Sequence, residues 1–370
     1  MKKILFLIHD LGQAGAEKVL VNLVNNMDRE KFDITVMSLF DVGVNRQFLA
    51  PHIHYVYCYK KMLPGNSHLM KILSSKELHR LLIKDKYDIE VAYLEGPCAR
   101  IISGCPDKET KLISWIHIEQ HTKERVAASF RSFAEATECY NRFHEIICVS
   151  ETVKKDFSSL VSLKAPVRVL YNTNESEKIK KAAAELVDEV KFSPNDFKVV
   201  GVGKLLKNKG FDRILRISEK LIKEGYSIHT YILGMGPEEY NLKRFVDEKK
   251  LANHITFLGY QTNPYKYVAK CDLFVCASYA EGFSTAATEA LIVGTPVCTV
   301  EVSGMKEMLG ENNEYGYVTE NNNEALYQAI KNMISDPTIL LHYKKMAKER
   351  GKMFSTETTV KAVESMFCSL

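Results

Sequence analysis

Short apolar strand patterns alternate with amphipathic helix patterns along the chain, and this alternation restricts the fold more than any other feature. In the first half, strand patterns are expected at residues 4–8, 34–39, 54–57, 89–94, 112–117 and 146–150. A second series follows, with strands at 198–203, 228–233, 255–258 and 272–278 and helices at 211–224, 238–249 and 285–293. Such alternation predicts an α/β fold with parallel, doubly wound sheets.

The length of 370 residues favours two domains over one. The first series ends with an apolar segment at 167–171, and Asn172 opens a polar, lysine-rich connection. A second β/α series then starts at Lys198. We therefore predict a first Rossmann-like domain over 1–175 and a second over 176–352.

Composition excludes several classes of protein. The net charge of +4 is too small to indicate nucleic acid, and no zinc-finger or aromatic-basic RNA-binding pattern occurs. No stretch approaches the roughly 20 apolar residues of a membrane span. The nine cysteines are odd in number, scattered, and without a Cys-x-x-Cys pair. Reduced thiols in a cytoplasmic protein fit this usage best.

The segment 281–289 carries the most specific chemical signal. Glu281 follows an apolar strand pattern, and a helix pattern starts immediately after it and ends at Gly294. The helix start, formed by Gly282, Phe283, Ser284 and Thr285, would offer free backbone N–H groups to an anion. Glu289 lies in the second turn of this helix and would reach another part of the same ligand. Two acidic residues at this spacing are common on solvated helices, but their place at a strand end indicates a nucleotide sugar.

Two further loops have the same strand–loop–helix setting. Gly15 would allow a phosphate to approach the backbone after the first strand, although glycine loops also occur at ordinary turns. After residues 198–203 the chain reads Gly203-Lys204-Leu-Leu-Lys-Asn-Lys209-Gly210. Lysines in loops are usually only solvated. At the carboxyl end of a strand, however, Lys204 and Lys209 could neutralise a diphosphate.

The chain resembles the retaining glycosyltransferases of family 4, which have two Rossmann-like domains facing each other across a cleft (the GT-B fold). The resemblance rests on Glu281-Gly-Phe-Ser…Glu289, followed by Gly-Thr-Pro-Val297. Two positions depart from the family pattern: Lys204 replaces an Arg and loses its bidentate geometry, and Ala14 replaces a Gly. The resemblance implies an acceptor-binding first domain and a donor-binding second domain. It also implies that a C-terminal helix, at about 353–370, packs back on the first domain.

This resemblance also implies an activity. The chain would be a hexosyltransferase that moves a sugar, with retention, from a nucleotide-diphosphate sugar such as UDP-sugar to a saccharide or lipid-linked acceptor. The product would be a capsule or exopolysaccharide. Glu281 would orient the sugar hydroxyls, Glu289 would bind the ribose, and Lys204, Lys209, Gly15, Gly203 and the amides of 282–285 would surround the diphosphate. The sequence contains no Asp-x-Asp, so no metal and no other cofactor is expected.

A histidine at a strand end is more often structural than catalytic. In the resembled family, however, a histidine at the place of His117 lies near the transferred sugar, so His117 is a candidate site residue and His121 a weaker one. Three rival functions stay open: a sugar phosphorylase, a nucleotide-sugar epimerase, and an inactive carbohydrate- or nucleotide-binding subunit.

The segment from Lys60 to Lys86 is rich in basic residues interleaved with Met and Leu. An ordinary amphipathic helix with a solvated basic face explains this pattern slightly better than a binding surface does. The alternative is a patch that rests on an anionic membrane, on the inner face of the cell membrane.

Overall fold

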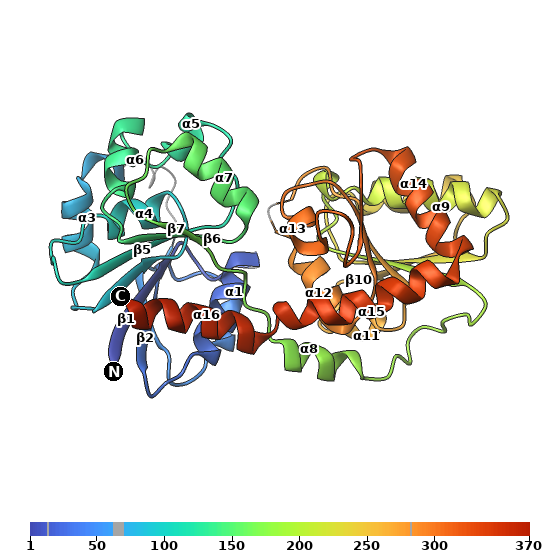
Figure 1. Cartoon of the computed structure of the whole chain (residues 1–370), viewed down its shortest axis with the longest axis horizontal. Helices are drawn as coiled ribbons and strands as arrows, with labels where there is room; N and C mark the ends of the chain where they lie inside the picture. The colour runs from blue at the N-terminus through green and yellow to red at the C-terminus, as the bar shows by residue number, and fades with distance from the viewer. Residues whose placement is uncertain (13–14, 62–69, 282) are drawn as a thin grey trace. The chain divides into compact units, whose positions relative to one another are not determined.

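The computed structural model describes residues 1–12, 15–61, 70–281 and 283–370. It divides the chain into two compact units, Met1–Asn174 with Thr356–Leu370, and Glu175–Ser355. Each unit is a parallel sheet with helices on both faces (Figure 1). The predicted α/β fold class, with two Rossmann-like sheets, is confirmed.

The sheet of the first unit has seven strands among the described residues, all parallel. Their spatial order is β3 (His54–Tyr59), β2 (Phe32–Phe40), β1 (Lys2–Ile8), β4 (Ile89–Ala92), β5 (Lys111–Ile116), β6 (Glu145–Cys148) and β7 (Val167–Val169). The central strands are buried along nearly their whole length, because a parallel sheet is covered on both faces. Strand β3 lies at the edge and is largely exposed.

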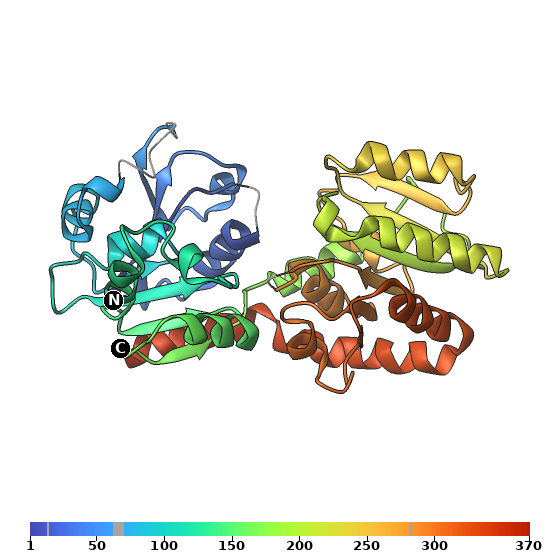
Figure 2. The ribbon, with the colours of Figure 1, turned by 90° about the horizontal axis from the view of Figure 1, so that it is seen from above.

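Helices cover both faces of this first sheet (Figure 2). Its described helical elements are α1 (Gly15–Asn26), η1 (Val44–Phe48), α3 (Ser75–Leu82), α4 (Pro97–Ile102), α5 (Lys123–Val126), α6 (Phe133–Tyr140), α7 (Glu151–Leu160) and α16 (Thr356–Ser369). Helix α16 packs beside α1. Its Phe367 ring lies 5.9 Å from that of Phe6 in β1, and the Asp28 N–H donates to the Glu364 carboxylate. The end of the chain therefore completes the core of the first unit.

The second unit has six parallel strands among the described residues. Their order is β10 (Ile255–Gly259), β9 (Ile228–Leu233), β8 (Phe197–Val202), β11 (Leu273–Cys276), β12 (Val297–Val300) and β13 (Tyr317–Thr319). The described helical elements are α8 (Ser176–Ala183), η2 (Lys207–Lys209), α9 (Phe211–Lys223), α10 (Glu239–Glu248), α11 (Tyr265–Val268), α12 (Thr285–Val293), α13 (Met305–Leu309), α14 (Asn323–Ser335) and α15 (Pro337–Met353).

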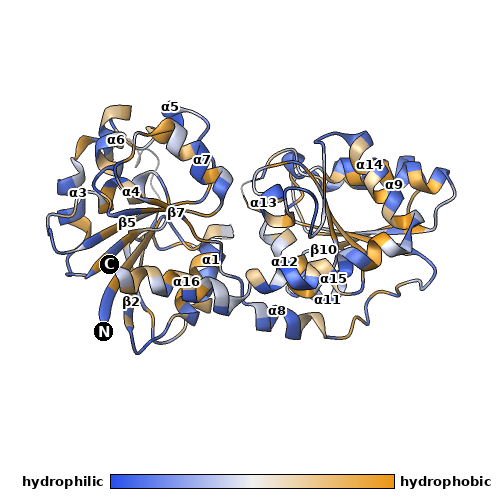
Figure 3. Ribbon diagram, in the orientation of Figure 1, coloured by the Kyte–Doolittle hydropathy of each residue, from blue (hydrophilic) through white to orange (hydrophobic). Residues whose placement is uncertain are grey.

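Hydrophobic residues concentrate in the strands and on the inward faces of the helices, while the outer helix faces are hydrophilic (Figure 3). In the second unit, α9 and α14 lie on one face of the sheet, and α8, α11, α12 and α15 lie on the other. All nine cysteines are free, and seven of them are buried. Several strands end one or two residues earlier than the sequence patterns indicate. His117, for example, stands just beyond β5 rather than at its last position.

Candidate functional site

Two loops of the second unit meet at the centre of its sheet. Strands β8 and β11 are neighbours there, although they are not consecutive in the chain, and the strand order reverses at this point. In open α/β sheets, ligands bind beyond the carboxyl ends of the strands at such a reversal. The Tyr279 N–H, in the loop after β11, donates to the Asn208 carbonyl in the loop after β8, at 2.8 Å. The loops carrying the predicted donor-site residues are therefore joined.

Gly210 allows the two loops to approach this closely. It has left-handed backbone angles, φ 66° and ψ 27°, and comes directly before α9. A Cβ atom at this position would lie 2.0 Å from the Ala277 carbonyl oxygen, which is far inside contact distance. The same carbonyl accepts a hydrogen bond from the buried Arg213 guanidinium at 3.1 Å. Only glycine satisfies both the backbone angles and the space.

Lys209 and Glu281 form an ion pair across these loops. The Lys209 Nζ lies 2.7 Å from Oε1 and 2.8 Å from Oε2 of Glu281. The Ser278 hydroxyl, itself buried, donates to the same Oε1 at 2.6 Å. The carboxylate is thus held from two sides, while the lysine side chain remains 29% exposed. A partly exposed ammonium in this position can bind an anionic ligand without leaving the carboxylate.

Helix α12 starts directly beside this pair. Ser284 caps the helix by accepting the Ala287 N–H on its hydroxyl, and Gly294 ends it in a left-handed conformation. Thr285 is the first helical residue, so its N–H is among those that lack a partner inside a helix. The Phe283 side chain is buried, with its ring 6.0 Å from that of Phe354. Gly282, also predicted to line the site, lies outside the described residues.

The other predicted donor-site residues have different settings. Glu289 lies on α12 and accepts a hydrogen bond from the Tyr265 hydroxyl at 3.0 Å. Gly203 follows β8 directly, and the Lys204 side chain after it is exposed. The structure therefore pairs Lys209 with Glu281 and places Glu289 in the second turn of α12.

In the first unit, His117 and Glu95 follow the neighbouring strands β5 and β4. The His117 N–H donates to Glu95 Oε2 at 3.2 Å, and the Gln120 side-chain amide lies 3.4 Å from Oε1. Burial raises the pKa of the Glu95 carboxyl. Gly15 is the exposed first residue of α1, after β1, which pairs with β4. These residues share the carboxyl edge of the first sheet.

The His117 ring is buried and neutral at pH 7. Its centroid lies 4.8 Å from that of Tyr93. Burial lowers its pKa to about 4, although a hydrogen bond with the Tyr93 backbone acts in the opposite direction. Among the described residues, its Nε2 has no hydrogen-bond partner. A buried ring nitrogen without a partner is able to bind a ligand hydroxyl. His121, in contrast, is exposed and has a left-handed φ of 61°.

Ser278, Tyr265 and Glu95 touch or flank the predicted site residues but were missed from the sequence. Ser278 had a signal, because it stands three residues before Glu281, at the end of the β11 pattern. Tyr265 and Glu95 had no such signal. Tyr265 is 24 residues from its partner Glu289, and Glu95 is 22 residues from its partner His117. Such pairings follow from the order of the strands rather than from local spacing.

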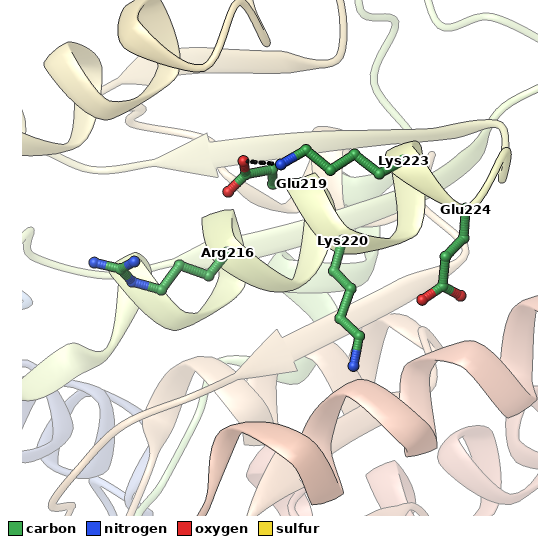
Figure 4. A pocket seen from close by; sticks show the side chains of 5 residues that line it. All are labelled: Arg216, Glu219, Lys220, Lys223 and Glu224. Carbon is green, nitrogen blue, oxygen red and sulfur yellow. Dashed lines mark hydrogen bonds and ion pairs between the residues drawn. The ribbon is translucent and has the colours of Figure 1, made fainter.

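An open pocket on α9 has no connection with this chemistry (Figure 4). Four of its five side chains are paired with one another or with α14, as in the Lys223–Glu219 contact of 2.6 Å and the Lys331–Glu224 contact of 2.8 Å. The fifth, Arg216, lies over the Phe245 ring of α10. The lining residues recur at helical spacing on one face, which is the pattern of a solvated, ion-paired surface. They are Arg216, Glu219, Lys220, Lys223 and Glu224.

Comparison with protein families matches both units. Residues 14–174 match the model described as Glycosyltransferase Family 4, and residues 183–352 match Glycosyl transferases group 1. The chain belongs to the family 4 glycosyltransferases. Each unit of this enzyme therefore matches a glycosyltransferase domain, and the family predicted from the segment 281–297 is confirmed.

Two bacterial relatives span 90% or more of the enzyme. It is 28% identical, over 96% of each chain, to N-acetylgalactosamine-N,N'-diacetylbacillosaminyl-diphospho-undecaprenol 4-alpha-N-acetylgalactosaminyltransferase of Campylobacter jejuni. It is 22% identical to the lipopolysaccharide core biosynthesis glycosyltransferase LpsD of Rhizobium meliloti, over 90% of this chain and 88% of that one. The crystal structure of HepE from Anabaena in complex with UDP and glucose matches all of both chains, with a TM-score of 0.75 at 19% identity. The last comparison confirms the GT-B fold.

Proposed function

We propose that this glycosyltransferase moves a hexosyl group from a UDP-sugar to a lipid-linked saccharide during cell-surface glycan assembly, with retention of configuration and without a metal ion. The ion pair between Lys209 and Glu281, beside the start of α12, carries the proposal. It combines an ammonium for a diphosphate with a carboxylate for sugar hydroxyls, at the place where this type of sheet binds ligands.

The donor would bind to the second unit. Its diphosphate would be neutralised by Lys209, with Lys204 and the amides at the start of α12 as further donors. Glu281 would orient the sugar hydroxyls, and Glu289 would accept hydrogen bonds from the ribose. UDP is proposed as the nucleotide because HepE, which has the same fold, was crystallised with UDP.

The acceptor would bind to the first unit, where His117 offers its Nε2 to a sugar hydroxyl. The Campylobacter jejuni relative is named for transfer to a diphospho-undecaprenol saccharide, and the Rhizobium meliloti relative for lipopolysaccharide core synthesis. Both names support an acceptor carried on a lipid.

In the proposed reaction, the bond between the sugar C1 and the diphosphate oxygen breaks, and the oxygen keeps the electron pair. Lys209 and the α12 amides stabilise that charge, which is the role a metal ion has in other transferases. The acceptor oxygen bonds to C1 on the same face, and its proton passes to the leaving phosphate. The Glu281 carboxylate is occupied by an ammonium and a hydroxyl, an environment unsuited to a metal ligand.

We also propose that the first unit contacts an anionic membrane. In α3 and just beyond it, Lys76, Arg80 and Lys84 are exposed, as are the apolar Ile72 and Leu81. Part of the segment 60–86 lies outside the described residues. Within the part of the chain that the structure describes, no helix is long and apolar enough to cross a bilayer. Basic and apolar side chains exposed together favour a surface contact.

The first test is a thermal-shift panel of UDP, GDP and their sugars, with and without EDTA. A ligand at 100 times its Kd should stabilise the enzyme by about 2.7 kcal/mol. If one UDP-sugar raised the melting temperature, and raised it equally with and without EDTA, that sugar would be identified as the donor. Transfer to a lipid diphosphate saccharide would then be followed by chromatography, and the product's anomeric configuration by NMR. The absence of a shift with every nucleotide, or an inverted product, would overturn the proposal.

The membrane contact needs its own test. Sedimentation with phosphatidylglycerol vesicles should be salt-sensitive and should weaken in the Lys76→Glu, Arg80→Glu double variant. Lys243→Glu, on the exposed face of α10 in the second unit, is the matched control. Equal binding of both variants would refute the role of α3.

A further inference from the structure

Three side chains with metal-binding atoms converge in the interior of the first unit. His79 comes from α3, Glu90 from β4, and Cys105 from the segment after α4. Each offers one ligand atom, and these atoms all lie within 4.8 Å of one another. The three residues come from separate elements, so their meeting is a property of the fold rather than of one sequence motif.

This cluster is closed to solvent. His79 is 6% exposed, and Glu90 and Cys105 are each 2% exposed. The His79 Nε2 lies 2.8 Å from Glu90 Oε2, and the Cys105 Sγ lies 3.7 Å from Glu90 Oε1. His79 is the partner of this carboxylate among the ion pairs of the described residues, and no Lys or Arg contacts it. A buried carboxylate needs compensation from its surroundings.

We propose that His79, Glu90 and Cys105 form a structural zinc site. A thiolate, an imidazole nitrogen and a carboxylate oxygen are the three protein ligand types that Zn²⁺ takes, whereas Mg²⁺ and Ca²⁺ select oxygen alone. Zn²⁺ with one thiolate and one carboxylate has no net charge, which suits a dry interior. The thiol proton of Cys105 leaves to solvent on binding, as does any proton held between His79 and Glu90.

The spacing of the ligand atoms is close to what the ion requires. At usual zinc bond lengths, tetrahedral ligand atoms stand roughly 3.3–3.6 Å apart. The sulfur–carboxylate distance of 3.7 Å is already near this value. The His79–Glu90 distance of 2.8 Å would have to open by about 0.5 Å, which side-chain rotation can supply. The carbonyl oxygen of Asp107, 3.8 Å from the Cys105 Sγ, could serve as the fourth ligand.

The position of the cluster assigns it a structural role. Glu90 is the second residue of β4, near the amino end of the strand, whereas Glu95 and the candidate acceptor residues follow the carboxyl end. The ion would join α3 to the central sheet, at the opposite end of β4 from the candidate acceptor residues. Its removal should therefore lower stability without changing the donor-dependent thermal shift. The inference does not depend on the proposed function.

The direct test uses Co²⁺ and Zn²⁺ alone on the full chain after dialysis against a chelator. We expect one Co²⁺ per chain with a thiolate-to-cobalt charge-transfer absorption, displaced by Zn²⁺, and a higher melting temperature with Zn²⁺. This measurement needs no variant, so it stands even if a substitution prevents folding. Absence of the thiolate band in the wild-type chain would overturn the proposal and leave a purely hydrogen-bonded trio.

Variants locate the ion. Cys105→Ser and His79→Gln should each lower the affinity of the chain for Co²⁺ and Zn²⁺ at least tenfold. Two controls should keep it: Cys368→Ser, which removes the exposed thiol, and His121→Ala, which breaks the surface group of Glu119, His121 and Asp156. Binding that survives Cys105→Ser but is lost in His121→Ala would place the ion on the surface and overturn the assignment.

Discussion

The Lys209 ammonium lies 2.7 and 2.8 Å from the two carboxylate oxygens of Glu281, 72 positions away in the chain. The pair joins the loops that follow β8 and β11, at the reversal of strand order in the second sheet. A single contact therefore fixes the distance between the group proposed to bind the diphosphate and the group proposed to orient the sugar. Changes to either residue should affect both ligand parts.

Lys209→Met should lower kcat/KM by about 10²–10³, the range seen when one charge-stabilising donor is removed from a transition state. The Glu281 carboxylate would lose its cation, and stability should fall by about 1–3 kcal/mol. Lys209→Arg should recover part of the activity, because it keeps the charge. Lys207→Met, at an exposed lysine of the same short helix, is the matched control. Equal kinetics for Lys207→Met and Lys209→Met would refute the role of the pair.

Ser278→Ala should lower kcat by about tenfold and change KM for the donor little, since a hydrogen bond to a charged group contributes about 1.5–3 kcal/mol. The hydroxyl donates to Glu281 Oε1 at 2.6 Å, so it positions the carboxylate without touching the donor. Ser278→Thr, which keeps the hydroxyl, should recover activity. Steady-state kinetics together with melting temperatures would separate the two effects. If Ser278→Ala changed only the melting temperature, the serine would be a packing residue.

Helix α12 is the element that the sequence predicts most accurately. Its bounds, Thr285–Val293, were predicted to the residue, because the chain marks both ends: Ser284 caps the start and Gly294 closes the end. The bounds of β9, Ile228–Leu233, were also predicted correctly. Local chemistry determines such features, and local chemistry can be seen in a sequence.

The exact end of β11 and the contacts between distant elements were not predicted. Ser278 was counted as the last residue of a strand, whereas the structure shows β11 ending at Cys276 and the serine turned to Glu281. The trio of His79, Glu90 and Cys105 gave no sequence signal, because three elements meet only after the sheet has formed. The Ser278 contact is local, so the error there was in the end of the strand, whereas the trio depends on how three elements pack together, which sequence patterns do not specify.

Gly210→Ala should destabilise the second unit more than Gly225→Ala does. Both glycines have positive φ, 66° and 89°. A new Cβ would lie 2.0 Å from the Ala277 carbonyl oxygen at Gly210, whereas nothing lies within 4 Å at Gly225. Gly225→Ala should therefore cost only the backbone term of about 1–2 kcal/mol, and Gly210→Ala should add a clash and reduce transfer activity. Urea denaturation of both variants would measure the difference; equal losses would argue against the close approach of the two loops.

His117 should make the stability of the first unit depend on pH. Burial lowers its pKa to about 4, below the value near 6.5 of an unfolded chain. As pH falls from 6.5 towards 4, the unfolded chain takes up a proton that the folded chain does not, so the stabilisation present above pH 6.5 is progressively lost. The full effect is about 3 kcal/mol. His117→Gln should flatten the dependence between pH 7 and pH 5 in urea denaturation, and the exposed His121→Gln should not. An unchanged slope in His117→Gln would show that His117 is not the group responsible.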